Sequence, residues 1–326
     1  MRRRSFLHAI PATSAGLLLG SLGEAEAADS FNQFLVGVDR MAAAKGVSYR
    51  TRLAALQGLQ ANPDVIRLNG HQPEFTQTWV QYSQKRLSQA RITNGQQKND
   101  AYRGVLASVR ARFGVDPGVI LGIWGQETDY GGYTGGYSVV QSLATLGWTS
   151  ARRDYFQSEL IAALQIIDGG AVSPQGMTGS WAGAMGQPQF MPSVYQRLAV
   201  SYDGQSRPNI WTNIPDSLAS IGNYLRRSGW RVGEAWGEAV ILPPTVNRQV
   251  YEADQTLPLS RWLDLGVRRL PQHPSMSLAS TARLVLPDGV GGASFLAYPN
   301  FKAIRRYNPS DYYALSVGLL GDLVTA

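Results

Sequence analysis

Apolar residues recur at helical spacing along most of the chain. In the segment 31–45, five of them fall on one face of a helix: Phe34, Leu35, Val38, Met41 and Ala42. This spacing predicts an amphipathic helix. The same pattern predicts further helices over 49–60, 74–91, 99–113, 118–130, 152–168, 192–201, 215–228 and 309–325. The pair Gly131-Gly132 predicts the end of the helix over 118–130, because glycine is the usual residue after a helix C-terminus.

The pattern changes after about residue 237. Two short apolar runs, 239–242 and 283–286, lie beside proline and glycine, as strands next to turns do, and a short helix is expected over 259–265. We therefore expect a mainly α fold (α+β). Its parts are an N-terminal helical section over 31–110, a helical core over 111–237, a small α/β subdomain over 238–292 and a C-terminal segment over 293–326 that returns to the core.

Composition restricts the chemistry that the chain can perform. Of the 326 residues, 44% are hydrophobic and 16% are charged, which excludes a mostly disordered chain and a coiled coil. Cysteine is absent, so disulfides, zinc thiolates and cysteine nucleophiles are excluded. Only three histidines are present, which excludes a multi-histidine metal site and gives little support to a Ser-His-Asp triad. We expect no metal and no cofactor, and a chemistry that rests on carboxylates, hydroxyls or amides.

The first 27 residues have the layout of an export signal peptide. Arginines open the chain, an apolar run follows, and an A-x-A cleavage pattern ends at Ala27. The pair Arg3-Arg4 favours the twin-arginine class, with an ordinary Sec signal as the alternative. We therefore expect a soluble periplasmic protein without a membrane anchor. Removing three Arg and two Glu with residues 1–27 changes the net charge from +7 to +6, which suits a polyanionic envelope polymer better than nucleic acid.

One carboxylate is distinguished by its position. Asp116 and Pro117 begin the helix expected over 118–130, and Glu127 lies near its end, within about 40° of two isoleucines on the apolar face. Burial and the negative end of the helix dipole both raise the pKa of a carboxyl group there, as a general acid near neutral pH requires. A buried glutamate held by a structural partner is the alternative. Asp129 lies about 200° around the helix from Glu127, so it cannot act as a second carboxylate.

The residues around Glu127 carry a family resemblance. The segment GIWGQETDYG at 122–131 resembles the catalytic segment of the B-type lytic murein transglycosylases, which have a lysozyme-like core. The most specific further match is GSWAGAMGQPQFMPS at 179–193. Other matches follow the family in order from about residue 31 to the C-terminus, at 73–82, 142–146, 152–156, 209–211, 221–225, 298–301 and 306–308.

The resemblance implies an activity and a set of site residues. The expected reaction cleaves the β-1,4 bond between N-acetylmuramic acid and N-acetylglucosamine in peptidoglycan and forms a 1,6-anhydromuramoyl end. Glu127 would be the single catalytic acid and base, because the 2-acetamido oxygen of the substrate can stabilise the cationic centre. The residues implied to bind substrate line a cleft: Tyr82, Ser180, Gln189, Phe190, Tyr224, Asn300 and Tyr307. Core packing is the alternative for the aromatic residues, and a loop hydrogen bond is the alternative for Gln189.

The expected partner is the peptidoglycan glycan strand, bound by a monomer. Two other functions stay open at this stage. A hydrolytic muramidase with the same acid would release a reducing end, and a non-catalytic envelope protein would bind glycan without cleaving it.

The segment 200–211 departs from some relatives, in which an EF-hand-like calcium loop occupies this place. A calcium loop needs carboxylates at alternate positions. Ser201 and Gln205 stand where acids are expected, which leaves Asp203 and Asp216. We therefore expect a loop that keeps its structure without a metal.

Overall fold

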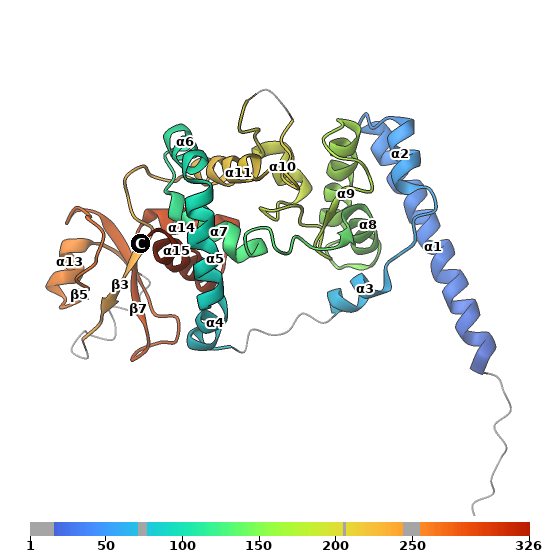
Figure 1. Ribbon diagram of the computed structural model, residues 1–326. Helices are drawn as coiled ribbons and strands as arrows, with labels where there is room; N and C mark the ends of the chain where they lie inside the picture. Colours follow the sequence, from blue (N-terminus) through green and yellow to red (C-terminus); the bar gives the residue numbers. More distant parts are fainter. Residues whose placement is uncertain (1–15, 71–76, 205–206, 244–254) are drawn as a thin grey trace, which may run out of the picture.

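The computed structural model describes residues 16–70, 77–204, 207–243 and 255–326, with side chains from Ser30 onward. Figure 1 shows three parts side by side: a sheet, a central group of helices, and a second group of helices that includes α1 and α2. The proposed cleavage pattern at Ala27 falls within α1, and Arg3-Arg4 lie outside the described residues. Within the described part of the chain, no helix is long and apolar enough to cross a membrane.

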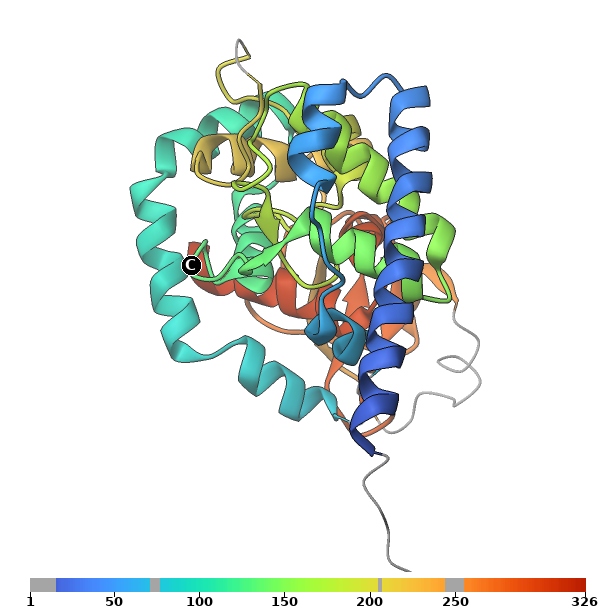
Figure 2. The ribbon, with the colours of Figure 1, turned by 90° about the vertical axis from the view of Figure 1, so that its right-hand side faces the viewer.

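The second group of helices is held by a shared apolar core. Helices α1 (Gly16–Ala44), α2 (Tyr49–Leu56) and α3 (Pro63–Gly70) pack on α8 (Val139–Thr149), α9 (Arg153–Asp168) and α10 (Pro192–Leu198). Phe31, Leu35 and Val38 of α1 are buried in this core, as the helical spacing predicts. Figure 2 shows α1 lying along α8 and α9.

The central group surrounds helix α7 (Pro117–Thr128). It consists of α4 (Trp79–Arg86), α5 (Gln89–Ala101), α6 (Arg103–Phe113), α11 (Ile214–Arg227), α14 (Pro299–Tyr307) and α15 (Asp311–Thr325). The prediction of a single helix over 74–91 is wrong. Leu87 ends α4, and the side chain of Ser88 accepts a hydrogen bond from the amide of Arg91, so that a new helix begins there.

Glycines let α7 and α15 approach closely. A Cβ atom on Gly122 would lie 2.1 Å from the carbonyl oxygen of Val317, and a Cβ atom on Gly321 would lie 2.5 Å from that of Gly118. Only glycine permits backbones at this separation. These contacts make the two helices antiparallel, so the start of α15 lies beside the end of α7.

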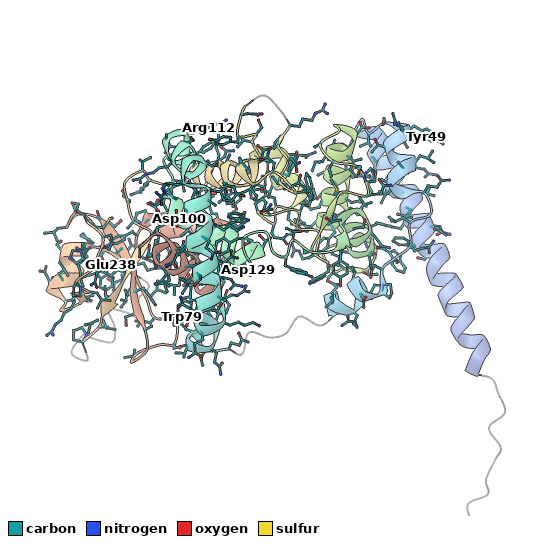
Figure 3. All side chains as sticks on the ribbon, in the orientation of Figure 1. Tyr49, Trp79, Asp100, Arg112, Asp129 and Glu238 are labelled. Atoms are coloured by element: carbon teal, nitrogen blue, oxygen red, sulfur yellow. The ribbon has the colours of Figure 1, made fainter. Side chains whose placement is uncertain are left out.

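Within the described residues, the sheet contains five antiparallel strands in the order β4-β6-β7-β3-β5. They are β3 (Gly237–Ile241), β4 (Thr256–Pro258), β5 (Arg268–Arg269), β6 (Thr281–Val285) and β7 (Ser294–Ala297), with helix α13 (Leu259–Asp264) after β4. In β3, Glu238 is buried, pairs with Arg269 at 2.9 Å and accepts a hydrogen bond from the hydroxyl of Tyr298. Figure 3 shows Glu238 in the sheet, apart from the central helices. The fold is thus mainly helical with a small sheet, which confirms the predicted fold class.

Two short strands join the loops on either side of α8 and α9. Strand β1 (Tyr137–Ser138) pairs antiparallel with β2 (Thr178–Gly179). This pairing brings the segment that follows α7 next to the segment 179–193. Two stretches far apart in the sequence therefore meet near Glu127.

Candidate active site

Helix α7 is capped at both ends by aspartate. The side chain of Asp116 accepts a hydrogen bond of 2.8 Å from the amide of Gly118, and Pro117 occupies the first turn, as predicted. The helix ends at Thr128, before the glycine pair that the sequence indicates. Asp129 and Tyr130 adopt left-handed backbone conformations, with φ of 51° and 59°, before Gly131 at 85°. Consecutive non-glycine residues in this conformation are costly and are concentrated at functional sites.

Glu127 differs in exposure from its neighbours on α7. Every other residue from Gly118 to Thr128 is buried, while Glu127 is partly exposed. The helix is therefore covered on all sides rather than along one apolar stripe. Burial raises the pKa of Glu127 to about 7, and the hydrogen bond from Tyr313 and the charge of Arg86 oppose that rise. The direction agrees with the shift expected from the sequence.

The carboxylate of Glu127 has a specific hydrogen-bond donor. The hydroxyl of Tyr313, in the first turn of α15, donates to Oε1 of Glu127 at 2.5 Å. Burial and the Glu127 charge raise the pKa of the Tyr313 phenol well above its usual value. The phenol therefore stays protonated at neutral pH and keeps donating to the carboxylate.

Three aromatic rings form a cluster beside Glu127. Tyr307 is close enough for the Glu127 charge to contribute to the raised pKa of its phenol, after the larger effect of burial. The ring centroid of Tyr307 lies 4.6 Å from that of Tyr224 and 5.8 Å from that of Phe190. The hydroxyl of Tyr307 donates to the carbonyl of Pro188, and that of Tyr224 donates to the carbonyl of Arg306. These bonds fix both phenols while leaving the side chains partly exposed.

The segment 179–193 is held to helix α7 by hydrogen bonds. Gln187 accepts a hydrogen bond of 2.7 Å from the Trp124 indole through its side chain and one of 3.0 Å from the Thr128 hydroxyl through its carbonyl. Gln189 has a left-handed backbone, with φ of 51°, and its amide nitrogen donates to the carbonyls of Thr134 and Gly186. The segment is therefore held in one position relative to Glu127.

Ser180 lies in the turn at the start of this segment. Its hydroxyl accepts a hydrogen bond of 3.1 Å from the amide of Ala184, and the residue is partly exposed. Ser180 and Gln189 thus both hold loop structure, as the alternative for Gln189 supposed, and both keep some surface in contact with solvent.

Two of the aromatic residues implied by the resemblance are buried. Tyr82 is 7% exposed, with its ring near those of Trp79 and Tyr312, and Phe190 is 2% exposed. These two rings therefore belong to the core beneath the site and are not part of its exposed surface.

Asn300 is not brought to the site. It is fully buried, its carbonyl oxygen accepts from the amide of Arg231, and its amide nitrogen donates to the carbonyls of Arg231 and Glu234. Because all of these bonds go to backbone, we correct the expectation for Asn300 to a structural role.

Asp129 points to another helix. Its carboxylate pairs with Arg91 of α5 at 3.0 Å and is half-exposed. Figure 3 shows Asp129 at the end of α7, next to α5. This agrees with the prediction that Asp129 does not act together with Glu127.

In the segment that takes the place of the calcium loop, the carboxylate of Asp216 binds the backbone. The two carboxylate oxygens of Asp216 accept hydrogen bonds of 2.8 Å from the amides of Tyr202 and Asn209. In the described residues no cluster of acids and histidines could hold a metal ion, and Gln205 lies outside them. The absence of metal stays a prediction.

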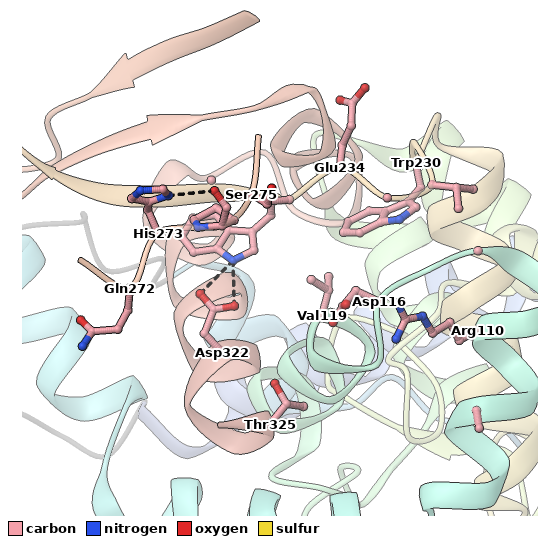
Figure 4. Close-up of a pocket in the computed structure, with 18 of the residues that line it drawn as sticks. Arg110, Asp116, Val119, Trp230, Glu234, Gln272, His273, Ser275, Asp322 and Thr325 are labelled. Carbon is pink, nitrogen blue, oxygen red and sulfur yellow. Dashed lines mark hydrogen bonds between the residues drawn. The ribbon is translucent and has the colours of Figure 1, made fainter. Parts of the chain in front are cut away.

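A large cavity lies at the opposite end of α7. Its volume is about 890 Å³, and the residues that line it include Arg110, Asp116, Trp230 and Asp322. Figure 4 shows Asp322 in this cavity. The indole of Trp236 donates to the Asp322 carboxylate. None of the predicted site residues lines this cavity. The predicted site around Glu127 is therefore separate from this cavity.

Sequence reasoning missed Tyr313, Arg86 and Gln187. Tyr313 directly follows a capped helix start, with the Ser310 side chain accepting from its amide, but nothing in the local sequence indicates that its ring reaches Glu127. Gln187 lies inside the matched segment at 179–193. The resemblance therefore indicated that the segment matters but not what Gln187 does.

Comparison with known proteins defines the class. The family model "Transglycosylase SLT domain" matches residues 30–322. The chain belongs to this family, which confirms the resemblance seen in the sequence.

Particular relatives are similar over nearly the whole chain. Membrane-bound lytic murein transglycosylase B of Escherichia coli is 30% identical over 302 residues, which are 88% of this chain and 81% of that protein. The structure of SltB3 from Pseudomonas aeruginosa in complex with NAG-NAM-pentapeptide is 38% identical, covers 91% of this chain and 80% of that one, and has a TM-score of 0.86. The E. coli lytic transglycosylase Slt35 in complex with bulgecin A is 29% identical, covers 91% and 93%, and has a TM-score of 0.75. The protein is thus a member of a lytic transglycosylase enzyme family.

Proposed function

We propose that the protein cleaves the β-1,4 bond between N-acetylmuramic acid and N-acetylglucosamine of peptidoglycan, with Glu127 as both acid and base. One observation carries the proposal: a partly exposed carboxyl group with a pKa of about 7 lies in an aromatic-walled site and accepts a hydrogen bond from Tyr313. The related SltB3 has been solved with NAG-NAM-pentapeptide and with NAG-anhNAM-pentapeptide. The second compound carries the anhydro end that this reaction forms.

In the first step, protonated Glu127 gives its proton to the glycosidic oxygen. The bond from C1 of the muramic acid to that oxygen breaks, and N-acetylglucosamine leaves with the bonding electrons and the proton. The 2-acetamido oxygen stabilises the cationic C1, as in other substrate-assisted glycosidases. A pKa near 7 keeps enough of the acid form for this transfer at neutral pH.

In the second step, the Glu127 carboxylate takes the proton from the 6-hydroxyl group of the same sugar. The oxygen of that group then bonds to C1 and closes the 1,6-anhydro ring, and Glu127 regains its proton. One carboxyl group suffices for both steps. Among the described residues, the groups that shift the Glu127 pKa are a phenol and a guanidinium, with no second acid.

Four side chains are proposed to bind sugar. The partly exposed rings of Tyr224 and Tyr307 offer flat faces to pyranose rings. Ser180 and Gln189 offer hydroxyl and carbonyl oxygen atoms beside them. Tyr82 and Phe190 support these residues from the core.

The experiment that tests the reaction is digestion of purified peptidoglycan sacculi, followed by mass spectrometry. We expect products with 1,6-anhydro ends, lighter by one water than reducing-end products. Reducing ends alone would identify a hydrolytic muramidase. Sacculi whose turbidity does not fall would identify a protein that binds glycan without cleaving it.

We also propose that the protein acts in the periplasm after twin-arginine export. The support is the arginine pair and the A-x-A pattern in the first 27 residues. Replacing Arg3 and Arg4 together by Lys should leave the precursor in the cytoplasm. Normal periplasmic amounts of that variant would assign the signal to the Sec class.

A further inference from the structure

The cavity at the start of α7 lies where several parts of the fold meet. Helices α6, α7 and α15 supply one part of its lining, and the segments 230–237 and 272–275 supply the other. Its volume of about 890 Å³ lies within the range of about 300–1,000 Å³ that is usual for pockets that hold small ligands. The proposed reaction at Glu127 makes no use of this cavity.

The cavity contains charges of both signs that are not neutralised. Asp116, Asp322 and Arg110 line it and are exposed, and none of the three forms an ion pair within the described residues. A third acid in the lining, Glu234, lies 3.6 Å from Arg231. Figure 4 shows Asp322 and Arg110 apart, with Asp116 between them in this view.

The contact between α7 and α15 brings two of the acids together. Gly321, which precedes Asp322, packs against Gly118, whose amide donates to Asp116. Asp322 keeps contact with solvent in the cavity, yet burial by the surrounding protein raises its pKa to about 6. The hydrogen bond from Trp236 opposes this rise, and the charge of Asp116 adds to it.

The helix dipole acts against Asp322 as well. The residue lies in the last turn of α15, which contains no basic residue, and the C-terminal end of a helix disfavours a negative charge. A positive group placed in the cavity would relieve the repulsion from the dipole and the repulsion from Asp116.

The rest of the lining suits a carboxylate and an apolar chain. Arg110 lies in the last turn of α6, and its guanidinium can bind a carboxylate through two parallel hydrogen bonds. Several apolar residues complete this part of the wall: Ala107, Ala111, Val119, Trp230 and Val232. The lining therefore fits a molecule that carries an ammonium group, a carboxylate group and an apolar part between them.

We infer that this cavity is a second binding site, for a small zwitterion whose ammonium and carboxylate groups are separated by an apolar chain. The ammonium group lies at Asp116 and Asp322, and the carboxylate group binds Arg110. The chain lies along Val119 and Trp230. The inference is independent of the proposed function, because none of these residues belongs to the site around Glu127.

The test compares three probe compounds. The first, 6-aminohexanoate, carries both charges, whereas pentylamine lacks the carboxylate and hexanoate lacks the ammonium group. Calorimetry measures their affinities. The NMR signal of the Trp236 indole N–H reports where they bind, because this group donates to Asp322 in the cavity.

The wild type should bind 6-aminohexanoate with a dissociation constant of about 1 mM or lower. Each single-charge compound should bind about tenfold more weakly, because it lacks one charge-assisted hydrogen-bonding group. Only binding in the cavity shifts the Trp236 signal. Equal affinities for the three compounds, no binding of 6-aminohexanoate, or binding that leaves the Trp236 signal unchanged would each overturn the inference. This comparison uses only the wild type, so it does not depend on the folding of a variant.

Variants assign the two charges. Asp322→Asn should lower the affinity for 6-aminohexanoate to about that of hexanoate, and Arg110→Gln should lower it to about that of pentylamine. The matched controls are Asp154→Asn and Arg50→Gln, exposed residues that do not line the cavity, and both should bind as the wild type does. An equal loss in the controls would overturn the inference.

The variant Glu127→Gln separates this site from the proposed active site. It should bind 6-aminohexanoate with wild-type affinity, whether or not the wild type cleaves peptidoglycan. Loss of binding in Glu127→Gln would place the compound at Glu127 and overturn the inference. A wild type that binds the compound in the cavity but leaves sacculi intact would refute the proposed reaction alone.

Discussion

The phenol of Tyr313 donates a hydrogen bond of 2.5 Å to Oε1 of Glu127, across 186 positions of sequence. The bond joins the first turn of α15 to the last turn of α7, and the close glycine contacts between these helices bring the two residues together. It stabilises the ionised form of Glu127, whereas burial stabilises the neutral form. The balance of the two leaves the pKa of Glu127 near neutral pH.

Glu127→Gln should abolish catalysis. The amide keeps the shape of the side chain but cannot transfer a proton, and general acid–base catalysis contributes about 10²–10⁴-fold. Because one residue serves both steps, we expect a loss at the upper end of that range or beyond, measured as the rate of anhydromuropeptide release. Asp129→Asn is the control and should retain most activity, since Asp129 pairs with Arg91. An active Glu127→Gln, or an inactive Asp129→Asn, would contradict the assignment.

Tyr313→Phe should shift the pH dependence of the reaction to higher pH. Removing the donor takes away an interaction that lowers the Glu127 pKa, so that pKa rises above about 7. The acid form then persists to higher pH, and the alkaline limb of the kcat/KM profile moves with it. We also expect kcat to fall about tenfold, because a hydrogen bond to a charged group is lost. Tyr312→Phe is the matched control, since the Tyr312 hydroxyl bonds to Pro287 and Asp288. The same pH limb in wild type and Tyr313→Phe would refute the proposed effect.

Glu127 should also make the folded state less stable as the pH rises. Its pKa is about 7 when folded and about 4.5 when unfolded, so between these values the folded state binds more protons. The free energy of unfolding therefore falls as the pH rises through this window, by at most about 3 kcal/mol. The stability of Glu127→Gln relative to wild type should increase between pH 5 and pH 8, measured by urea unfolding. A difference that stays constant with pH would show that Glu127 has an ordinary pKa.

Gly122→Ala should destabilise the protein and inactivate it. The new Cβ would lie 2.1 Å from the Val317 carbonyl oxygen, so α7 and α15 must move apart. Overpacking of this kind costs about 1–3 kcal/mol or more, and the movement separates Tyr313 from Glu127. In contrast, Gly104→Ala in α6 meets nothing within 4 Å and should stabilise the protein by up to about 1 kcal/mol. Thermal unfolding and activity of the two variants check this, and similar melting temperatures would contradict it.

Excess chelator should leave the melting temperature unchanged. The carboxylate of Asp216 accepts hydrogen bonds from two backbone amides, so we expect the loop to keep its structure without a cation. A site filled to one hundred times its dissociation constant would add about 2.7 kcal/mol of stability. A fall of several degrees in calorimetry with chelator would show that the loop binds metal.

Local features of the chain could be predicted from its sequence. The capped start of α7 and the place of Glu127 in it depend on neighbouring residues, so spacing reveals them. The break between α4 and α5 did not follow from apolar spacing, because it depends on the hydroxyl of Ser88 at the start of α5. A side-chain cap can therefore start a new helix while the helical spacing of apolar residues continues.

Long-range contacts could not be predicted in this way. Tyr313 reaches Glu127 because α7 and α15 lie antiparallel at glycine contacts, and no local pattern contains that information. Asn300 shows the converse. An amide in a matched motif can bind a ligand or satisfy buried backbone, and only its 0% exposure and three backbone bonds decide between the two. The burial of Tyr82 could not be predicted either, because an aromatic residue in a matched motif can bind a sugar or pack in the core.

The order of synthesis gives the contact between α7 and α15 a further consequence. The ribosome adds Glu127 long before it adds Tyr313. A growing chain therefore contains Glu127 before it contains the Tyr313 hydroxyl that donates to it or the helix α15 that packs on α7. The site is assembled only when α15 has been made and has docked on α7. We therefore expect a nascent or truncated chain that lacks α15 to be inactive, so that peptidoglycan is cleaved only by molecules in which this helix has been translated.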